Sequence, residues 1–189
     1  MWLTGIAASL VLEEPLKRAD LILAEAAVLP DPHVAAHAAL LYREGYAPRI
    51  AMVHYVRTRR LDDAGIELPR SLEQLLQTYW KDAGLDSARV ESVPVEVVDP
   101  VTLNTARQVA EYCRREGIRR VILVSMRFHS RRSTLSYRRF MRPLGIEVLS
   151  QPAPTGLQID TWWKTKDGVL LVGQEYIKWL YYRLATPIA

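Results

Sequence analysis

The residues best suited to chemistry lie in one short stretch, where an apolar run gives way to hydroxyl, imidazole and guanidinium groups. Residues 121–125 form a β-branched run typical of a buried strand, His129 follows in the next loop, and Arg132 falls in the first turn of a basic helix. In parallel sheets, ligands bind outside the carboxyl ends of the strands. An anion there would meet the N-terminus of the helix, and Arg132 would add a bidentate clamp. We interpret Ser125, His129 and Arg132 as part of an anion site, with His129 as the catalytic candidate for acid–base chemistry.

A purely structural interpretation of the same stretch stands beside the functional one. The arginines would then form a solvated helix face, and His129 would only hydrogen-bond its loop. Arg138, Arg139 and Arg142 lie further along the helix, and we expect all three to face solvent.

A second polar group precedes the strand of Ser125 along the chain. Thr102, Asn104 and Thr105 are good N-cap residues, and we expect one of them to cap a helix that begins near Thr105. Because one cap accounts for only one of these three residues, the other polar side chains at this strand–helix junction are left without a structural role. Those side chains indicate ligand contacts beside the Ser125 site.

Glu175 and Lys178 stand three residues apart on the final helix. Spacing alone favours an exposed ion pair worth a few tenths of a kcal/mol. A role for them in ligand binding rests on the family resemblance described below.

Two other groups of residues could suggest chemistry but can also be explained by ordinary structural roles. Asp31, His33 and His37 look like metal ligands, since the two histidines share a helix face, but no third and fourth ligand with suitable spacing accompanies them, so we expect no metal site. Trp162 and Trp163, beside lysines, would suit a stacking wall, a lid over the site or core packing. The one cysteine, Cys113, lies on the apolar face of its helix, and we expect it in the core.

The bulk composition indicates one globular domain over residues 1–189 and a small anionic ligand as the partner. The formal net charge is only +4, and the basic residues gather between 114 and 142, so nucleic-acid binding is disfavoured. The apolar stretch 2–12 is too short to span a bilayer, which predicts no stable membrane insertion. We expect a cytoplasmic protein, membrane-associated if a native N-terminal anchor precedes this sequence; the oligomeric state stays open.

The elements that must position these residues alternate between strand and helix. We expect strands at 19–24, 49–53, 93–98, 121–125 and 145–149, and a further one at 169–172 after a tight turn at 167–168. Helices are expected at 32–44, 71–84 and 105–117, in the basic segment, and at the C-terminus. This alternation predicts an α/β protein with a mainly parallel sheet of five or six strands and helices on both faces.

Several of these segments, in this order, resemble the YdcF/SanA/ElyC-like family, a bacterial domain of unknown function. The resemblance covers nearly the whole chain and rests on residues 11–23, 39–48, 102–105 (similar to a Ser-x-Asn-Thr motif), 124–132 (similar to a His-x-x-Arg motif), and Glu175, Lys178, Tyr181 and Tyr182. It implies a Rossmann-like three-layer sandwich with a pocket at the strand ends. It also implies links to S-adenosylmethionine binding in some members and to cell-envelope biogenesis in others, with no settled reaction.

The chain departs from the family pattern at glycines. Ala26 and Ala27 stand where the family has a Gly-Gly pair, and Val53, His54 and Tyr55 replace a Ser-Gly-Gly sequence. Alanine narrows the backbone conformations and close approaches that glycine allows. Either the ligand differs from the family's usual one, which fits a hydrolase or transferase for a nucleotide-like molecule, or catalysis is lost while binding survives in a regulatory protein.

Overall fold

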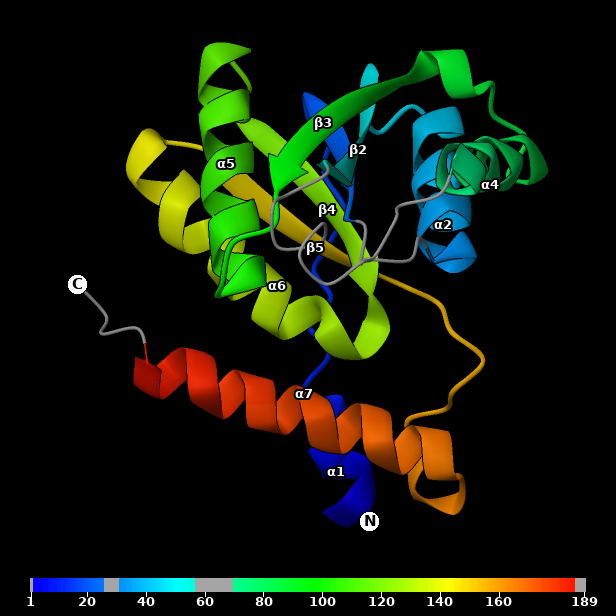
Figure 1. The fold of residues 1–189 in the computed structure, drawn as a ribbon, viewed down its shortest axis with the longest axis vertical. Helices are drawn as coiled ribbons and strands as arrows, with labels where there is room; N and C mark the ends of the chain where they lie inside the picture. The colour runs from blue at the N-terminus through cyan, green and yellow to red at the C-terminus, as the bar shows by residue number, and fades with distance from the viewer. Residues whose placement is uncertain (1, 26–30, 57–69, 186–189) are drawn as a thin grey trace.

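Five parallel strands form the centre of the protein. The computed structural model describes residues 2–25, 31–56 and 70–185. The strands are β1 (Leu21–Ala24), β2 (Arg49–Val56), β3 (Val90–Glu96), β4 (Arg120–Met126) and β5 (Glu147–Ala153), in the spatial order β3-β2-β1-β4-β5 (Figure 1). Every neighbouring pair is parallel, and β1 pairs with both β2 and β4. The predicted α/β class and parallel sheet are confirmed, with five strands in the described residues.

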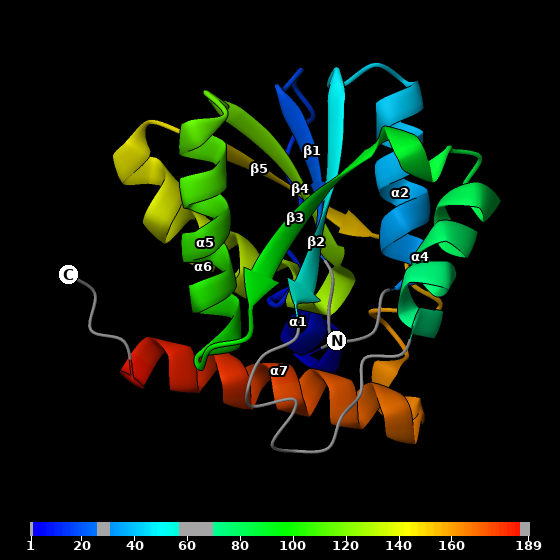
Figure 2. The same ribbon diagram turned by 45° about the horizontal axis from the view of Figure 1, so that its top comes forward.

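Two helices cover each face of the sheet in the part of the chain that the structure describes, which makes the three-layer sandwich expected from the sequence. The helices α2 (Pro32–Arg43) and α4 (Arg70–Asp82) lie on one face, and α5 (Val101–Arg115) and α6 (Ser130–Met141) lie on the other (Figures 1 and 2). Because successive side chains of a strand point to opposite faces, Ile22 and Ala24 pack with α2. Leu21 and Leu23 pack with α5 and α6 on the opposite face.

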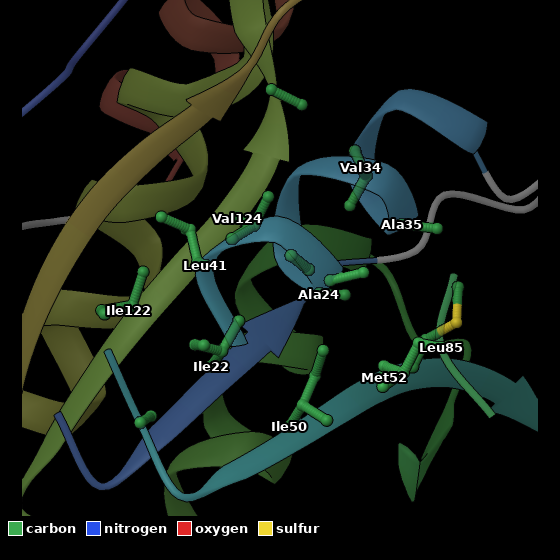
Figure 3. Packing of buried hydrophobic residues seen from close by; sticks show 14 of the residues in the cluster. Ile22, Ala24, Val34, Ala35, Leu41, Ile50, Met52, Leu85, Ile122 and Val124 are labelled. Carbon is green, nitrogen blue, oxygen red and sulfur yellow. The ribbon is translucent and has the colours of Figure 1, made fainter. Parts of the chain in front are cut away.

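The core under α2 is built from aliphatic side chains and alanines, together with Met52 and Trp80. Figure 3 shows Ile22, Ile50 and Ile122 from three neighbouring strands facing Val34 and Leu41 of α2. On the other face Cys113 is fully buried among the side chains of α5 and β4, which confirms its assignment to the core. The sheet is therefore buried on both faces, as parallel sheets require.

The long helix α7 (Lys166–Ala185) crosses the carboxyl ends of the strands, with the short helix α1 (Trp2–Ala8) beside it (Figures 1 and 2). Ala7 and Leu10 pack with Phe128, Trp162 and Val172 in a third apolar cluster. The indole N–H of Trp162 donates to the carbonyl of Leu3, at 2.9 Å. Of the three roles considered for Trp162, core packing is the one observed.

The predicted strand at 169–172 is wrong, since these residues and the expected turn at 167–168 belong to the first turns of α7. A four-residue apolar run has no periodicity that separates a strand from a buried helical segment. Gly168, Val172 and Glu175 are buried, at the i, i+4, i+7 spacing of one helix face. Residues 169–172 therefore add no strand to the sheet.

The start of α5 also differs from expectation. The helix begins at Val101 with Pro100 as its N-cap, and no side-chain cap hydrogen bond forms. Thr102, Asn104 and Thr105 therefore lie inside the helix, and the prediction that one of them caps it is wrong. Pro100 itself is extended, with φ −70° and ψ 120°, and as a proline it has no N–H that would need a partner at the helix start.

The basic helix is more engaged than expected. Arg138 donates to the carbonyl of Val148 and pairs with Glu14, so its predicted exposure is wrong. Arg139 and Arg142 are exposed as predicted. In the ranges described, no helix is long and apolar enough to cross a membrane.

Candidate functional site

A cleft of about 1050 Å³ lies between the carboxyl ends of the strands and helix α7. This is the position at which parallel sheets bind ligands. Its floor carries five polar side chains from five different elements of the chain: Glu25 after β1, Thr102 on α5, His129 in the turn after β4, Arg132 on α6 and Glu175 on α7. Segments far apart in sequence therefore supply one polar cluster.

Arg132 and Glu175 form the centre of the cluster. The guanidinium donates from Nε to Oε2 at 2.8 Å and from Nη2 to Oε1 at 2.9 Å, a bidentate pair. Its Nη1 donates to the hydroxyl of Thr102 at 2.8 Å. The ring of Tyr182 lies 5.1 Å from the guanidinium carbon, within cation–π range. Each nitrogen of Arg132 is already engaged within the protein.

The expected role of Arg132 as a clamp for a ligand anion is corrected by this geometry. The group it clamps is the carboxylate of Glu175, and an incoming anion would have to displace that carboxylate. The expectation that Glu175 forms only an exposed pair with Lys178 is also wrong. Glu175 is 7 % exposed, and Lys178 contacts it from the rim at 3.4 Å.

His129 lies between two carboxylates. Its Nε2 is 3.4 Å from Glu25, and its Nδ1 is 3.4 Å from Glu175. Burial opposes the charged imidazolium, but the charge of Glu25 and the contact with Glu175 outweigh it, so the pKa of His129 lies above its usual value. Both contacts are longer than a strong hydrogen bond, and each ring nitrogen faces one carboxylate.

The carboxylate of Glu175 is held in its ionised form by the neighbouring cations. Burial alone would raise the pKa of Glu175, but His129 and Arg132 hold that pKa far below the usual range of a carboxyl group. Glu25 accepts a hydrogen bond from the buried hydroxyl of Ser133.

Tyrosines close the floor toward the sheet and toward α7. Burial, with the nearby charge of Glu25, raises the pKa of Tyr55 to about 12. The phenol of Tyr182 accepts the backbone N–H of Thr102 at 3.0 Å, which ties α7 to the start of α5. The phenol of Tyr55 is therefore protonated at neutral pH, and its O–H is a donor in the cleft.

The structure brings together five of the eight site residues predicted from the sequence, and separates the other three from the cleft. Thr102, His129, Arg132, Glu175 and Lys178 line it. Asn104 donates to the carbonyls of Val98 and Pro100 and so holds the loop before α5. Ser125 and Thr105 are buried at 0 % and 1 % exposure and do not line the cleft. The ligand roles predicted for these three are not supported by their positions.

Sequence reasoning missed Glu25 and Tyr55, which line the cleft, and the buried Ser133, which donates to Glu25. Glu25 directly follows β1, whose four residues are all buried, so an acidic residue at that strand end was a usable signal. Ser133 gave no signal, because serine next to arginine in a helix is ordinary. Ala26 and Ala27 lie outside the described residues.

The residues considered as metal ligands have a structural role in part. Asp31 caps α2 by accepting the backbone N–H of His33 at 2.8 Å. Among the residues with described positions, no group of three or more suitable side chains could hold a metal ion.

Comparison with known proteins gives only distant likenesses. No protein-family model matches the chain, and no curated protein matches it. One similar solved structure is the reductase domain of an aureusimine biosynthetic cluster, at 15 % identity and a TM-score of 0.32, over 66 % of this chain and 39 % of that one. Another is the U34-tRNA thiolase NcsA from Methanococcus maripaludis, at 11 % identity and a TM-score of 0.38, over 100 % of this chain and 67 % of that one. At these values neither likeness bears on function.

Proposed function

We propose that the cleft binds an anionic, phosphate- or nucleotide-like small molecule and that His129 is the group that meets its charge. The observation that supports this is the position of His129 on the cleft floor, where flanking carboxylates favour its cationic form. A protonated imidazole can hold an anion and can also pass a proton to a leaving oxygen. The reaction class that fits is hydrolysis or group transfer on a phosphate-containing compound.

The surrounding residues divide into positioning and steering roles. Arg132 fixes Glu175, and Glu175 and Glu25 in turn orient the imidazole from its two nitrogens. Lys178 and Arg127 line the rim, where their charges would draw an anion toward His129. Arg132 thus acts on the ligand through other residues.

The family resemblance adds named ligands to this proposal. We propose that the chain is a divergent member of the YdcF/SanA/ElyC-like family, on the strength of the motifs around Thr102, His129 and Glu175. S-adenosylmethionine then becomes one candidate ligand, and a cell-envelope process one setting. A phosphate compound would meet the imidazolium by its anion, whereas S-adenosylmethionine would place its sulfonium near the carboxylates.

A non-catalytic binding or regulatory protein is the second candidate. The observation in its favour is that the hydroxyls near the floor hold its charged groups in place: Thr102 accepts a hydrogen bond from Arg132, and the buried Ser133 donates to Glu25. This is the role that such hydroxyls would have in a protein that binds a ligand without turnover.

The decisive experiment is a thermal-shift panel of inorganic phosphate, nucleotides, sugar phosphates and S-adenosylmethionine on wild type, His129→Gln and His37→Gln. His37 is a matched control because it is a partly buried histidine on α2 that does not line the cleft. A ligand at a hundred times its Kd adds about 2.7 kcal/mol to the folded state. We expect a shift with wild type and His37→Gln that His129→Gln loses.

Each result of this panel has a distinct meaning. A shift that survives in His129→Gln contradicts the proposed site, and the lack of any shift contradicts the ligand class. Phosphate release from the stabilising compound then separates the two candidates. Binding without release favours the regulatory protein.

A further inference from the structure

Helix α7 carries an exposed apolar ridge. Leu170, Ile177, Tyr181 and Leu184 are 49 %, 72 %, 52 % and 72 % exposed. Their spacing of seven, four and three residues places them along one line of the helix. At a rise of 1.5 Å per residue the line is about 20 Å long. An apolar surface of this length on a helix whose other side is already packed is unusual for a surface helix.

The ridge is continuous with the wall of the cleft. Leu170 and Tyr181 belong to both, since each lines the cleft and is about half exposed. Other walls of the cleft are apolar as well, from Met126, Phe128, Leu157 and Leu171. Charged groups lie on the floor around His129 and also at the rim, where Arg127 and Lys178 are found, so charged groups and apolar walls face the same cleft.

We infer that the ligand of this cleft is an amphiphile, with an anionic head on His129 and a long alkyl or isoprenoid chain that leaves over Leu170 and Tyr181 and lies on the ridge. This inference rests on the proposed function and narrows its substrate class. A compact group such as a nucleobase would occupy only the cleft and leave the ridge uncovered. A flexible chain covers both surfaces with one molecule, and its charged end matches the cationic imidazole and Lys178.

The length of the ligand's alkyl chain is the property to vary in a test of this inference. Calorimetric titration of inorganic phosphate, butyl phosphate, octyl phosphate and dodecyl phosphate, each below its aggregation concentration, measures the contribution of the chain to affinity. A buried methylene is worth about 0.8 kcal/mol, which corresponds to about fourfold in affinity at full burial. On a half-open ridge we expect about twofold per methylene, and so at least about tenfold between butyl and octyl phosphate.

A double variant on the ridge tests where the chain lies. Ile177→Gln with Leu184→Gln alters two exposed side chains, so the fold should be kept. We expect this variant to bind phosphate with the affinity of wild type. Its affinity should rise much less than that of wild type between octyl and dodecyl phosphate. Leu135→Gln with Leu144→Gln is the matched control, because both leucines are exposed apolar residues that do not line the cleft. The control variant should show the same rise in affinity with alkyl chain length as wild type.

The outcomes separate the two proposals. If His129→Gln abolishes phosphate binding but affinity does not depend on the length of the alkyl chain, the proposed function stands and the inference of an amphiphilic ligand is wrong. Failure of every compound to bind overturns both. If sedimentation shows a wild-type dimer that the ridge variant breaks, and chain length has no effect, the ridge is an interface between copies and the inference is wrong.

Discussion

Two arginine–glutamate pairs lie at opposite ends of the sheet and share the same bidentate geometry. At the amino ends of the strands, Arg49 donates to Glu91 at 2.7 and 2.6 Å and also contacts Glu116 at 2.9 Å. At the carboxyl ends, Arg132 donates to Glu175 at 2.8 and 2.9 Å. The pairs differ in burial: the side chains of the first are 31 % and 34 % exposed, and those of the second 7 % and 10 %.

The difference in burial gives the two pairs different physical consequences. A solvated pair gains little free energy and is screened by salt. A buried pair costs desolvation, and removal of one partner leaves a charge that nothing compensates. The Arg49 pair joins the starts of β2 and β3, whereas the Arg132 pair sets the charge around His129. Equal geometry therefore does not imply equal roles.

The largest effect expected is that of Arg132→Ala on stability. Glu175 would remain buried without its main partner, so we expect a loss of about 3–5 kcal/mol in the free energy of unfolding. Urea denaturation monitored by circular dichroism measures it. A loss below about 1 kcal/mol would mean that solvent reaches Glu175, which contradicts the buried network.

A double-mutant cycle sharpens the comparison. Arg132→Ala combined with Glu175→Gln should be less destabilised than the two single changes added together, with a coupling of about 2–3 kcal/mol. The same cycle at Arg49 and Glu91 should give at most about 1 kcal/mol. Equal couplings in the two cycles would show that burial does not distinguish the pairs.

The pH dependence of the carboxyl-end network is the next test. Because the pKa of His129 is raised in the folded protein, its stabilising contribution is complete below the unfolded value of about 6.5 and is lost as pH rises through the folded value. The stability advantage of wild type over His129→Gln should therefore shrink as pH rises above 6.5. Anion affinity should fall over the same range. Thermal unfolding from pH 5.5 to 9 measures the first effect, and a widening advantage would exclude an imidazolium at this position.

The smallest effect expected is at Arg49. We expect Arg49→Ala to cost about 0–1 kcal/mol at low salt and less at high salt, because the pair is partly solvated. Ligand binding in the cleft should not change, since Arg49 does not line it. Unfolding at low and high sodium chloride checks both statements, and a loss comparable to that of Arg132→Ala would contradict the comparison.

Much of the fold could be predicted from local patterns. The apolar β-branched runs gave the position of each of the five strands, and β1 and β4 are buried at nearly every position because helices cover both faces. Their parallel arrangement followed from the alternation of strands with helices. The position of His129 at a strand end, and hence in the cleft, followed from the same pattern. These are properties of short stretches of chain, which the sequence contains in full.

Tertiary structure decided that Glu175 is buried. It also decided that Glu25 lies in the cleft and that Ser133 contacts it. Glu175 and Lys178 have the spacing of an exposed helical pair, and only the crossing of α7 over the strand ends places one inside and the other at the rim. Likewise Ser125 stands at a strand end but is fully buried and does not line the cleft. The sequence by itself determined which residues could meet at the carboxyl edge of the sheet. Which of them do meet depended on the packing direction of α7, because side-chain burial is set by contacts between segments far apart in the chain.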